Sequence, residues 1–426
     1  MSLHYLKLGL LLLYFFSSNV YAQITPACYS INHFYKEHQL LSDTSFLNIL
    51  ALPVGDFHLN INSDPGLQSF FTKNQNKIII DFNQYINNVD INSHHFLELK
   101  NPLLYYAFKH HDRVYSLGMD HRVFIDFSLS HELISLFVNG NSQYLNQTFL
   151  LGNNNYGSAF NYFSIYFGYS RKIQEKFYLN SRIKFIKGVN SFQLDLEGTQ
   201  FVLQDNFNTQ KNPFDIELNS NFLYSINKDY KLFSNLGLAF DLYLDYDYNN
   251  RINFYTSAND LGFILWNENH HQSQADFHFD GIDYSLDQVL STEFDNLQDT
   301  LLDVFSTDSF TSNEFRLTPF STNLGMTYDF LNRGHLNINC NIQKLYNSVF
   351  YTGKIAYLKY FDKYQLSIIP SYSFNKYNFT NLSIVVNKKW YSKFYTNLYI
   401  DNILDFFIPV SELGHIGFGW ELYVLF

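Results

Sequence analysis

Apolar and polar residues alternate with a period of two along most of the chain beyond about residue 100. From His415 to Phe426 the even positions are all apolar, whereas the odd positions are mostly glycine or polar. Successive side chains of a β-strand point to opposite faces, so this segment predicts a strand with one apolar face and one polar face. Such a strand is typical of a membrane barrel, where one face meets lipid and the other a wet lumen.

The same alternation recurs with short polar breaks. Segments of this kind begin near Tyr115, Phe160, Phe177, Phe192, Ile216, Leu232, Ile252, Phe315, Leu336, Tyr351, Tyr364, Phe379, Phe394 and His415. Many last ten residues or more, and a tilted bilayer crossing needs about 9–11 residues. Strands in lipid must close into a barrel, because every backbone polar group needs a partner. The pattern predicts an all-β fold, a transmembrane antiparallel β-barrel of about 14 strands, with 12 or 16 as alternatives.

The first 22 residues have the pattern of a secretory signal peptide. Lys7 precedes the short apolar run Leu8–Phe16, and Val20-Tyr21-Ala22 fits the small-x-small cleavage rule. We expect the mature chain to begin at Gln23, with lipoprotein processing at Cys28 as the alternative. Export together with the strand pattern predicts the bacterial outer membrane as the location, with outer-membrane lipid as the surroundings.

Two regions do not alternate. Residues 23–100 mix short strand patterns with Asn-rich stretches, and we expect a plug in the lumen, or else a periplasmic segment. The barrel itself is expected over 101–426. Within it, residues 268–313 form an insertion in which Leu286–Phe305 has apolar residues at helical spacing and aspartates opposite. A shorter helix is expected over Ser130–Val138.

Charge and cysteine content exclude some classes. The formal net charge is −11, and no Lys or Arg occurs between Arg251 and Arg316. Nucleic-acid binding needs a basic surface, so it is not supported. The two cysteines, Cys28 and Cys340, indicate no disulfide framework. Cys340 falls on an apolar parity and is expected to face lipid. No cofactor is implied.

The last strand also sets the expected topology. With Phe426 at the periplasmic rim, the final strand runs inward, and the acidic insertion 268–313 falls outside the cell. A terminal aromatic strand resembles the assembly signal of bacterial outer-membrane barrels. The barrel-assembly machinery is therefore an expected partner, through the strand that ends at Phe426.

Several stretches carry a family resemblance over about residues 100–426. They are Arg182-x-Lys184-x-x-x-Gly188, Asp260-Leu-Gly262-Phe-Ile-Leu-Trp266, Phe279-Asp280-Gly281-Ile282-Asp283 and Asp401-Asn402-Ile-Leu. In this order they resemble uncharacterised outer-membrane β-barrels of Bacteroidota, a group similar to long-chain fatty-acid transporters and to type IX secretion-associated barrels. The resemblance implies a fold and a location, and no established activity.

Four residues are candidates for ligand binding. Asp260 and Trp266 share a strand parity, so they are either a lumen-facing carboxylate and aromatic that contact a ligand, or a glycine kink followed by an interface-girdle Trp. We favour the girdle. Asp280 and Asp283 flank a glycine before the acidic helix, where a turn and a helix start also explain them. No metal site is predicted, because adjacent histidines such as His270-His271 point to opposite faces of a strand.

The sequence supports no enzyme, since Ser, His and acidic residues form no recognisable local motif. By analogy of fold, we expect a barrel for passive transport or holding of a hydrophobic small molecule. The alternative is a structural or secretion-associated barrel that presents its extracellular insertion to a protein partner, with the apolar stripe of Leu286–Phe305 as the contact.

Overall fold

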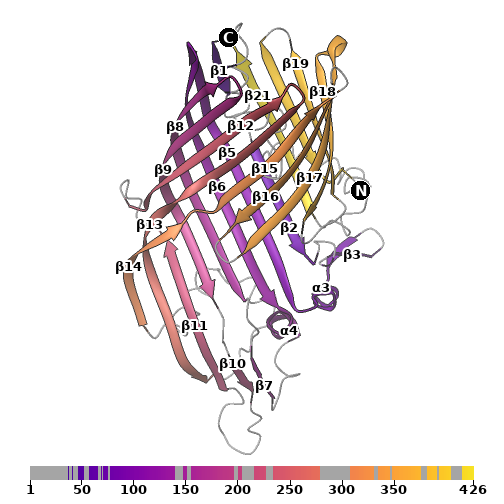
Figure 1. Cartoon of the computed structure of the whole chain (residues 1–426). Helices are drawn as coiled ribbons and strands as arrows, with labels where there is room; N and C mark the ends of the chain where they lie inside the picture. The colour runs from indigo at the N-terminus through magenta and orange to yellow at the C-terminus, as the bar shows by residue number, and fades with distance from the viewer. Residues whose placement is uncertain are drawn as a thin grey trace, which may run out of the picture.

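One antiparallel sheet closes on itself to form a barrel (Figure 1). This computed structural model describes residues 37, 41, 47–51, 57–65, 69, 71–74, 77–139, 147–150, 155–195, 200–203, 215–226, 234–278, 308–330, 334–345, 348–375, 381–390, 393–403 and 415–426. In the described residues, no helix is long and apolar enough to cross a bilayer.

The described strands occupy fourteen positions around the wall, which confirms the predicted barrel and its strand number. Three of the positions hold two shorter strands in line. In ring order the wall consists of β5 (Asn92–His110), β6 (Arg113–Ser130), β8 (Tyr156–Gln174), β9 (Phe177–Asp195), β11 with β12 (Asp215–Ile226 and Leu236–Asn249), β13 (Ile252–His278), β14 with β15 (Asp308–Leu317 and Phe320–Asp329), β16 (His335–Lys344), β17 (Val349–Phe361), β18 (Leu366–Asn375), β19 (Asn381–Trp390), β20 (Phe394–Asp401), β21 (His415–Leu425), and β1 with β2 (Asn48–Ala51 and Phe57–Asp64).

The wall closes between its first and last strands. In β1, Ile49 pairs with Leu425 of β21 on one side and with Ala107 of β5 on the other. In β2, Leu59 pairs in the same way with Phe418 and Leu99. The prediction of a plug over 23–100 is therefore wrong for β1, β2 and the start of β5, which belong to the wall. Each is too short, or too irregular in sequence, to show a barrel pattern alone.

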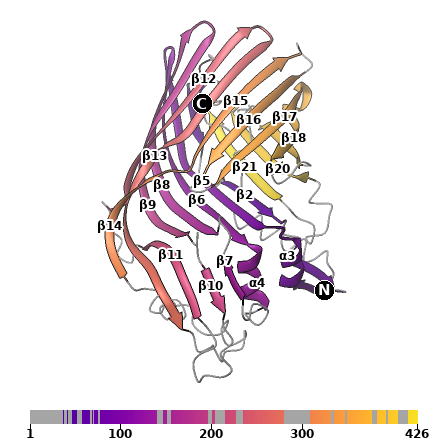
Figure 2. The ribbon, with the colours of Figure 1, turned by 60° about the horizontal axis from the view of Figure 1, so that its bottom comes forward.

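The two ends of the barrel differ. One end, here called the turn end, carries the C-terminus and the connections at 110–113, 174–177 and 249–252 (Figure 1). The opposite end, here called the loop end, carries the smaller elements (Figure 2). The loop-end elements are β3 (Phe71–Asn74), β4 (Lys77–Ile80), α3 (Phe82–Asn88), α4 (His131–Asn139), β7 (Gln147–Leu150) and β10 (Gln200–Leu203). The 3-10 helix η4 (Asp362–Tyr364) lies at the turn end, between β17 and β18. The short helix expected over Ser130–Val138 is present as α4.

The acidic insertion is shorter than predicted. Strand β13 continues to His278, where it pairs with β11, and β14 starts at Asp308. Residues 268–278 and 308–313 are thus strand, because their backbone groups find partners on neighbouring strands. The expected helix Leu286–Phe305 lies outside the described residues.

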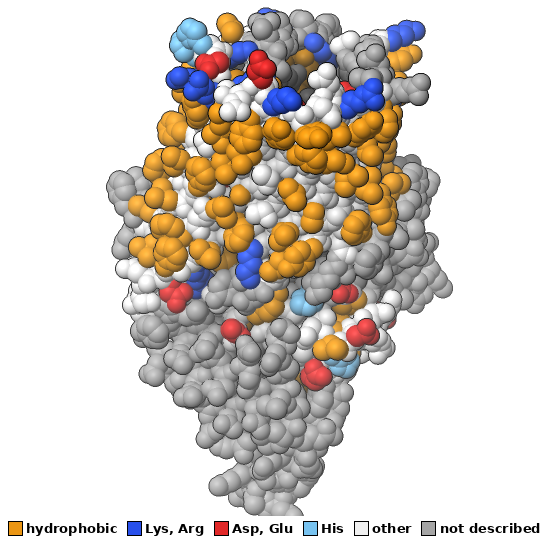
Figure 3. Space-filling view, in the orientation of Figure 1, with side chains coloured by type: hydrophobic (Ala, Val, Ile, Leu, Met, Phe, Trp, Pro, Cys, Tyr) orange, Lys and Arg blue, Asp and Glu red, His pale blue; other side chains and the backbone are white. Residues whose placement is uncertain are grey.

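Large apolar side chains cover the outside of the wall. Figure 3 shows them as a band across the face in view, with most of the Lys and Arg of this face at the turn end. The inner face is mostly polar. On β21, for example, Trp420 points outward and is 39% exposed, whereas its neighbour Glu421 is fully buried inside. Cys340 is a free, exposed cysteine on the outward parity of β16, as predicted. The alternation in the sequence therefore reports correctly which face of each strand meets lipid.

Helices α3 and α4 pack together at the loop end through Tyr85, Ile86, Val89 and Ile134. Tyr85 also joins α3 to the wall, because its hydroxyl donates to His95 Nε2 at 2.5 Å. His95 Nδ1 in turn donates to Ser63 Oγ at 2.9 Å, since that hydroxyl donates onward to the Pro65 carbonyl. Burial raises the pKa of the Tyr85 hydroxyl to about 12.

Candidate functional site in the lumen

A layer of buried ion pairs spans the lumen. Arg122 on β6 lies 2.9 Å from the Asp260 carboxylate on β13. Lys184 on β9 lies 2.5 Å from Asp260 and 2.8 Å from Asp241 on β12. All four side chains are at most 3% exposed. Charges this deep are tolerated only when they are paired, so each ion holds its partners in place.

The layer reaches the opposite wall through Glu98 on β5. Its carboxylate lies 3.4 Å from Arg122 and accepts a hydrogen bond of 3.1 Å from Gln343 on β16. A second polar link crosses nearby, where the Ser348 hydroxyl donates to the Asp126 carboxylate at 2.7 Å. Strand β16 and the connection that precedes β17 are therefore linked through the lumen to β5 and β6, and side chains occupy the interior at this level.

Asp260 reaches this layer because the strand bulges. Its φ is +60°, in the left-handed region that Asp tolerates better than most residues. The pairing of β12 with β13 shifts register between Phe240 and Leu242, opposite this point. The Asp260 amide donates to the Asp241 carboxylate at 2.7 Å, and its carbonyl accepts from the Thr318 hydroxyl. Bulges re-aim side chains, and here the carboxylate is aimed at two cations.

Nearer the turn end, Glu37 is fully buried inside the barrel. Its carboxylate lies 2.8 Å from Arg182 of β9 and accepts a 2.9 Å hydrogen bond from the Tyr105 hydroxyl. Ser170 and Asn180 also donate to it. These contacts, here called the Glu37 latch, fix one residue of the N-terminal segment to three wall strands. The extent of a plug over the rest of residues 23–100 stays a prediction.

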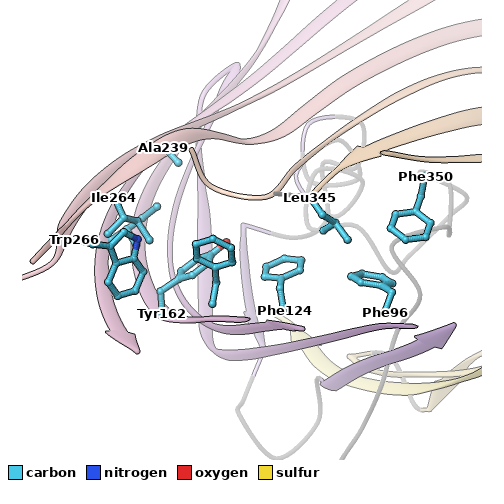
Figure 4. Packing of buried hydrophobic residues seen from close by; sticks show 10 residues of the cluster. Phe96, Phe124, Tyr162, Ala239, Ile264, Trp266, Leu345 and Phe350 are labelled. Carbon is cyan, nitrogen blue, oxygen red and sulfur yellow. The ribbon is translucent and has the colours of Figure 1, made fainter. Parts of the chain in front are cut away.

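Toward the loop end from the ion layer lies an apolar cluster, here called the aromatic cluster (Figure 4). Its members are buried side chains that come from both sides of the barrel: Phe96, Phe124, Phe160, Tyr162, Ile186, Ala239, Ile264, Trp266, Leu345 and Phe350. Phe96 and Phe350 face each other across the lumen with ring centroids 5.1 Å apart. Phe124 and Tyr162, and likewise Phe160 and Trp266, stand at aromatic contact distances.

The structure brings together two of the four predicted site residues. Asp260 enters the ion layer and Trp266 enters the aromatic cluster. The girdle interpretation of Trp266 is wrong, because its side chain is fully buried in the lumen, over Gly188. Asp280 and Asp283 lie outside the described residues. In the described part of the chain, no group of three or more His, Cys, Asp or Glu could hold a metal ion.

Sequence reasoning missed Glu37, Glu98 and Arg122 as members of the site. A signal was present for two of them, since Glu98 and Arg122 are charged residues in the middle of strands that cross a membrane. Such residues face a lumen and find partners there. Glu37 carries no such signal, because nothing in its own segment indicates that it enters a barrel.

A closed antiparallel barrel with an apolar band outside and paired charges inside is an outer-membrane β-barrel. Within this class, the chain belongs to a family of unknown function, DUF5723, whose profile matches residues 44–398. No curated protein matches the sequence.

Among solved structures, the chain is similar to the toluene transporter TodX of Pseudomonas putida, with 8% identity and a TM-score of 0.42 over 96% of this chain and 94% of that one. The toluene transporter TbuX of Ralstonia pickettii has 7% identity and a TM-score of 0.42, covering 90% and 89%. A Pseudomonas aeruginosa FadL homologue has 11% identity and a TM-score of 0.39, covering 89% and 88%. The predicted links to Bacteroidota and to type IX secretion stay predictions.

Proposed function

We propose that this barrel holds a hydrophobic small molecule in its lumen and passes it across the outer membrane. The observation that supports the proposal is the aromatic cluster. Most buried side chains of the described inner wall are polar. Two apolar clusters interrupt them, and the aromatic cluster, with Phe96, Phe124, Phe160 and Phe350, is the larger; the smaller one lies near the turn end. Sites for small apolar ligands are lined by aromatic side chains with a few polar groups at their margin, as here.

The lumen supports a gated barrel and not an open pore. The side chains of the ion layer, the aromatic cluster and the Glu37 latch are almost inaccessible to solvent. A ligand would therefore pass only after these contacts rearrange. The Glu37 latch is the natural place for such a change, because it joins a segment outside the wall strands to the wall through polar contacts, beside the apolar packing of Leu41.

The order of the aromatic cluster, the ion layer and the Glu37 latch along the lumen favours transport of the ligand from the loop end to the turn end. Short turns are typical of the periplasmic end of such barrels, so we assign the turn end to the periplasm. A molecule that enters from outside would then meet the aromatic cluster first, the ion layer next and the Glu37 latch last. Capture by the aromatic cluster would precede release past the latch.

A binding experiment tests this proposal. In the full chain with Trp390→Phe and Trp420→Phe, Trp266 is the remaining tryptophan, so its fluorescence reports on the aromatic cluster. We expect saturable quenching or a spectral shift on titration with naphthalene. Phe124→Ala should weaken the binding about tenfold, as expected for loss of an apolar contact worth about 1.4 kcal/mol.

The matched control is Phe167→Ala, which removes a ring of the same size from the lipid-facing side of β8, where Phe167 is 58% exposed. It should leave naphthalene binding unchanged. The proposal fails if no saturable signal is seen, or if the two substitutions weaken binding equally. Mass spectrometry of small molecules extracted from protein purified from its native membrane would identify the natural cargo.

Two further interactions are proposed from the sequence pattern. Strand β21 pairs along its length and ends next to the exposed ring of Phe426, which supports recognition of this strand by the barrel-assembly machinery. The apolar stripe over Leu286–Phe305, outside the described residues, remains the expected contact for a protein partner.

A further inference from the structure

Two polar groups inside the aromatic cluster have no hydrogen-bond partner among the residues that the structure describes. They are the indole Nε1 of Trp266 and the hydroxyl of Tyr162, and both side chains are fully buried. A buried polar group left unpaired costs about 1–3 kcal/mol, so each such group in a folded protein needs an explanation. Trp266 can only donate a hydrogen bond, whereas Tyr162 can donate or accept one.

Two more donors lie beside them. Arg122 Nε and Asn235 Nδ2 are also buried, and the described part of the chain offers them no hydrogen-bond partner. The strand register places all four groups in one row along the inner wall. Arg122 pairs with Tyr162, Tyr162 pairs with Gly188, and the Trp266 ring lies over Gly188. The Gly188 amide then donates to the Asn235 carbonyl at 2.8 Å. The row forms the boundary between the aromatic cluster and the ion layer.

The charge next to this row disfavours an anion. The acids Glu98, Asp120, Asp241 and Asp260 are buried here with the two cations Arg122 and Lys184. The formal balance of this layer is negative, and both cations already hold carboxylate partners. Lys100 also acts on Glu98 and Asp260, but among the described residues the four acids still outnumber these three cations. Bringing a further negative charge into the same low-dielectric layer would therefore add repulsion.

We propose that the ligand of the aromatic cluster is an uncharged molecule with an apolar body and a hydrogen-bond-accepting oxygen, such as a ketone, an ester or an alcohol. This inference rests on the proposed function. The apolar body lies among the phenylalanine rings, and the oxygen accepts from the Trp266 indole and the Tyr162 hydroxyl. A pure hydrocarbon leaves these donors unpaired, and a carboxylate meets the acidic layer.

Three probes of similar size separate the possibilities: ethylbenzene, acetophenone and benzoate. Their affinities are measured by calorimetry on the full-length protein in detergent. We expect acetophenone to bind about tenfold more tightly than ethylbenzene, the ratio that one net hydrogen bond of about 1.4 kcal/mol supplies. Benzoate should bind more weakly than acetophenone.

The ratio of acetophenone to ethylbenzene affinity is the readout for the variants. Trp266→Phe and Tyr162→Phe each remove a donor while keeping an aromatic ring, and each should bring the ratio toward one. Trp420→Phe, on the lipid-facing side, should leave the ratio unchanged. Retention of the native unfolding temperature by each variant shows that the barrel is intact.

The outcomes distinguish the two proposals. If ethylbenzene or benzoate binds at least as tightly as acetophenone, or if the ratio survives both substitutions, the neutral oxygen-bearing ligand is rejected while the hydrophobic-ligand barrel stands. Water alone at the unpaired donors would give this result. If none of the three probes binds, both the proposed function and the ligand class are rejected.

Discussion

Arg122 on β6 and Asp260 on β13 are joined by a 2.9 Å ion pair, although β8, β9 and β12 lie between them in the wall. The contact is a chord across the inside of the barrel and not a link between neighbouring strands. It therefore ties together parts of the wall that the backbone hydrogen bonds of the sheet do not connect. Its partners Lys184 and Glu98 extend the same chord.

Neutralising Asp260 should destabilise the barrel strongly. In Asp260→Asn, Arg122 and Lys184 stay buried but lose a shared negative partner, which costs about 3–5 kcal/mol. Thermal unfolding in detergent, followed by circular dichroism, measures the loss. Asp112→Asn breaks an exposed pair with Arg171 and should leave the unfolding temperature unchanged. Equal effects of the two substitutions would contradict a stabilising role for the ion layer.

Weakening the Glu37 latch should release the N-terminal segment. Glu37→Gln keeps the shape of the side chain but removes the charge that Arg182 and Tyr105 bind. We expect faster cleavage of the N-terminal segment by an added protease, with the barrel left intact. Glu175→Gln, an exposed position in the turn between β8 and β9, is the control. Unchanged cleavage in Glu37→Gln would show that the latch does not hold the segment.

The cavity that holds the Trp266 ring depends on Gly188. A Cβ at Gly188 would lie 2.6 Å from an atom of the Trp266 ring, so Gly188→Ala must displace the indole. Overpacking of this kind costs about 1–3 kcal/mol. Gly157→Ala is the matched control, since its nearest contact would be 3.5 Å. Trp266 emission should change in the first variant alone, and an identical spectrum in both would argue against the packing described.

Depth in the membrane should decide how a charge on the outer face is tolerated. Ile165 and Ile173 both face outward from β8 with similar exposure, 47% and 50%, but Ile173 lies at the turn end. Ile165→Arg should cost about 2–4 kcal/mol, and Ile173→Arg about 0–1 kcal/mol. Unfolding in lipid vesicles compares the two, and a similar cost for both would place the apolar band elsewhere.

Alkaline pH should weaken the attachment of helix α3 to the wall at the loop end, which depends on Tyr85. The folded protein raises the pKa of Tyr85 to about 12, against about 10 in the unfolded chain. The folded state therefore binds this proton more tightly. The contribution of this proton to the free energy of unfolding is complete below pH 10. It falls by about 2 kcal/mol as the pH rises toward 12. Tyr85→Phe should show a smaller fall in the free energy of unfolding over this range. If stability falls equally with pH in the two proteins, Tyr85 is not the group responsible.

Much of the barrel could be predicted because the relevant information is local. Whether Trp420 or Glu421 faces lipid follows from strand parity alone. The count of fourteen segments matches the number of wall positions because two errors offset each other: the positions of β9 and of β11 with β12 were each counted twice, and those of β5 and of β1 with β2 were missed.

The ion layer could not be predicted in the same way. Parity places Arg122 inside, but it leaves Asp260 open, because Phe254 and Leu261 on either side of the bulge face outward on opposite parities. The partner of each charge also depends on how the barrel closes, which is a property of the whole sheet.

Three local features also escaped the pattern. The bulge at Asp260 shifts the register by one residue, which no periodicity records. Strand β1 has four residues, too few to show an alternation, although it completes the wall. Trp266 was assigned to the girdle because an aromatic residue near a strand end is common there, and only its neighbours in space, Gly188 and Phe160, show that it lies inside.

The closure of the wall by β1 and β2 has a consequence for how the molecule is made. Until these strands reach β21, the ladders of β5 and β21 each have a free edge, and such an edge is costly in lipid and open to pairing with another chain. The pairing of β1 and β2 with β21 joins segments that are almost the whole sequence apart. Closing so long a loop costs chain entropy, so we expect this pairing to form late and slowly. Biogenesis of this barrel therefore requires that its two extremities be held close together until the final ladder has formed.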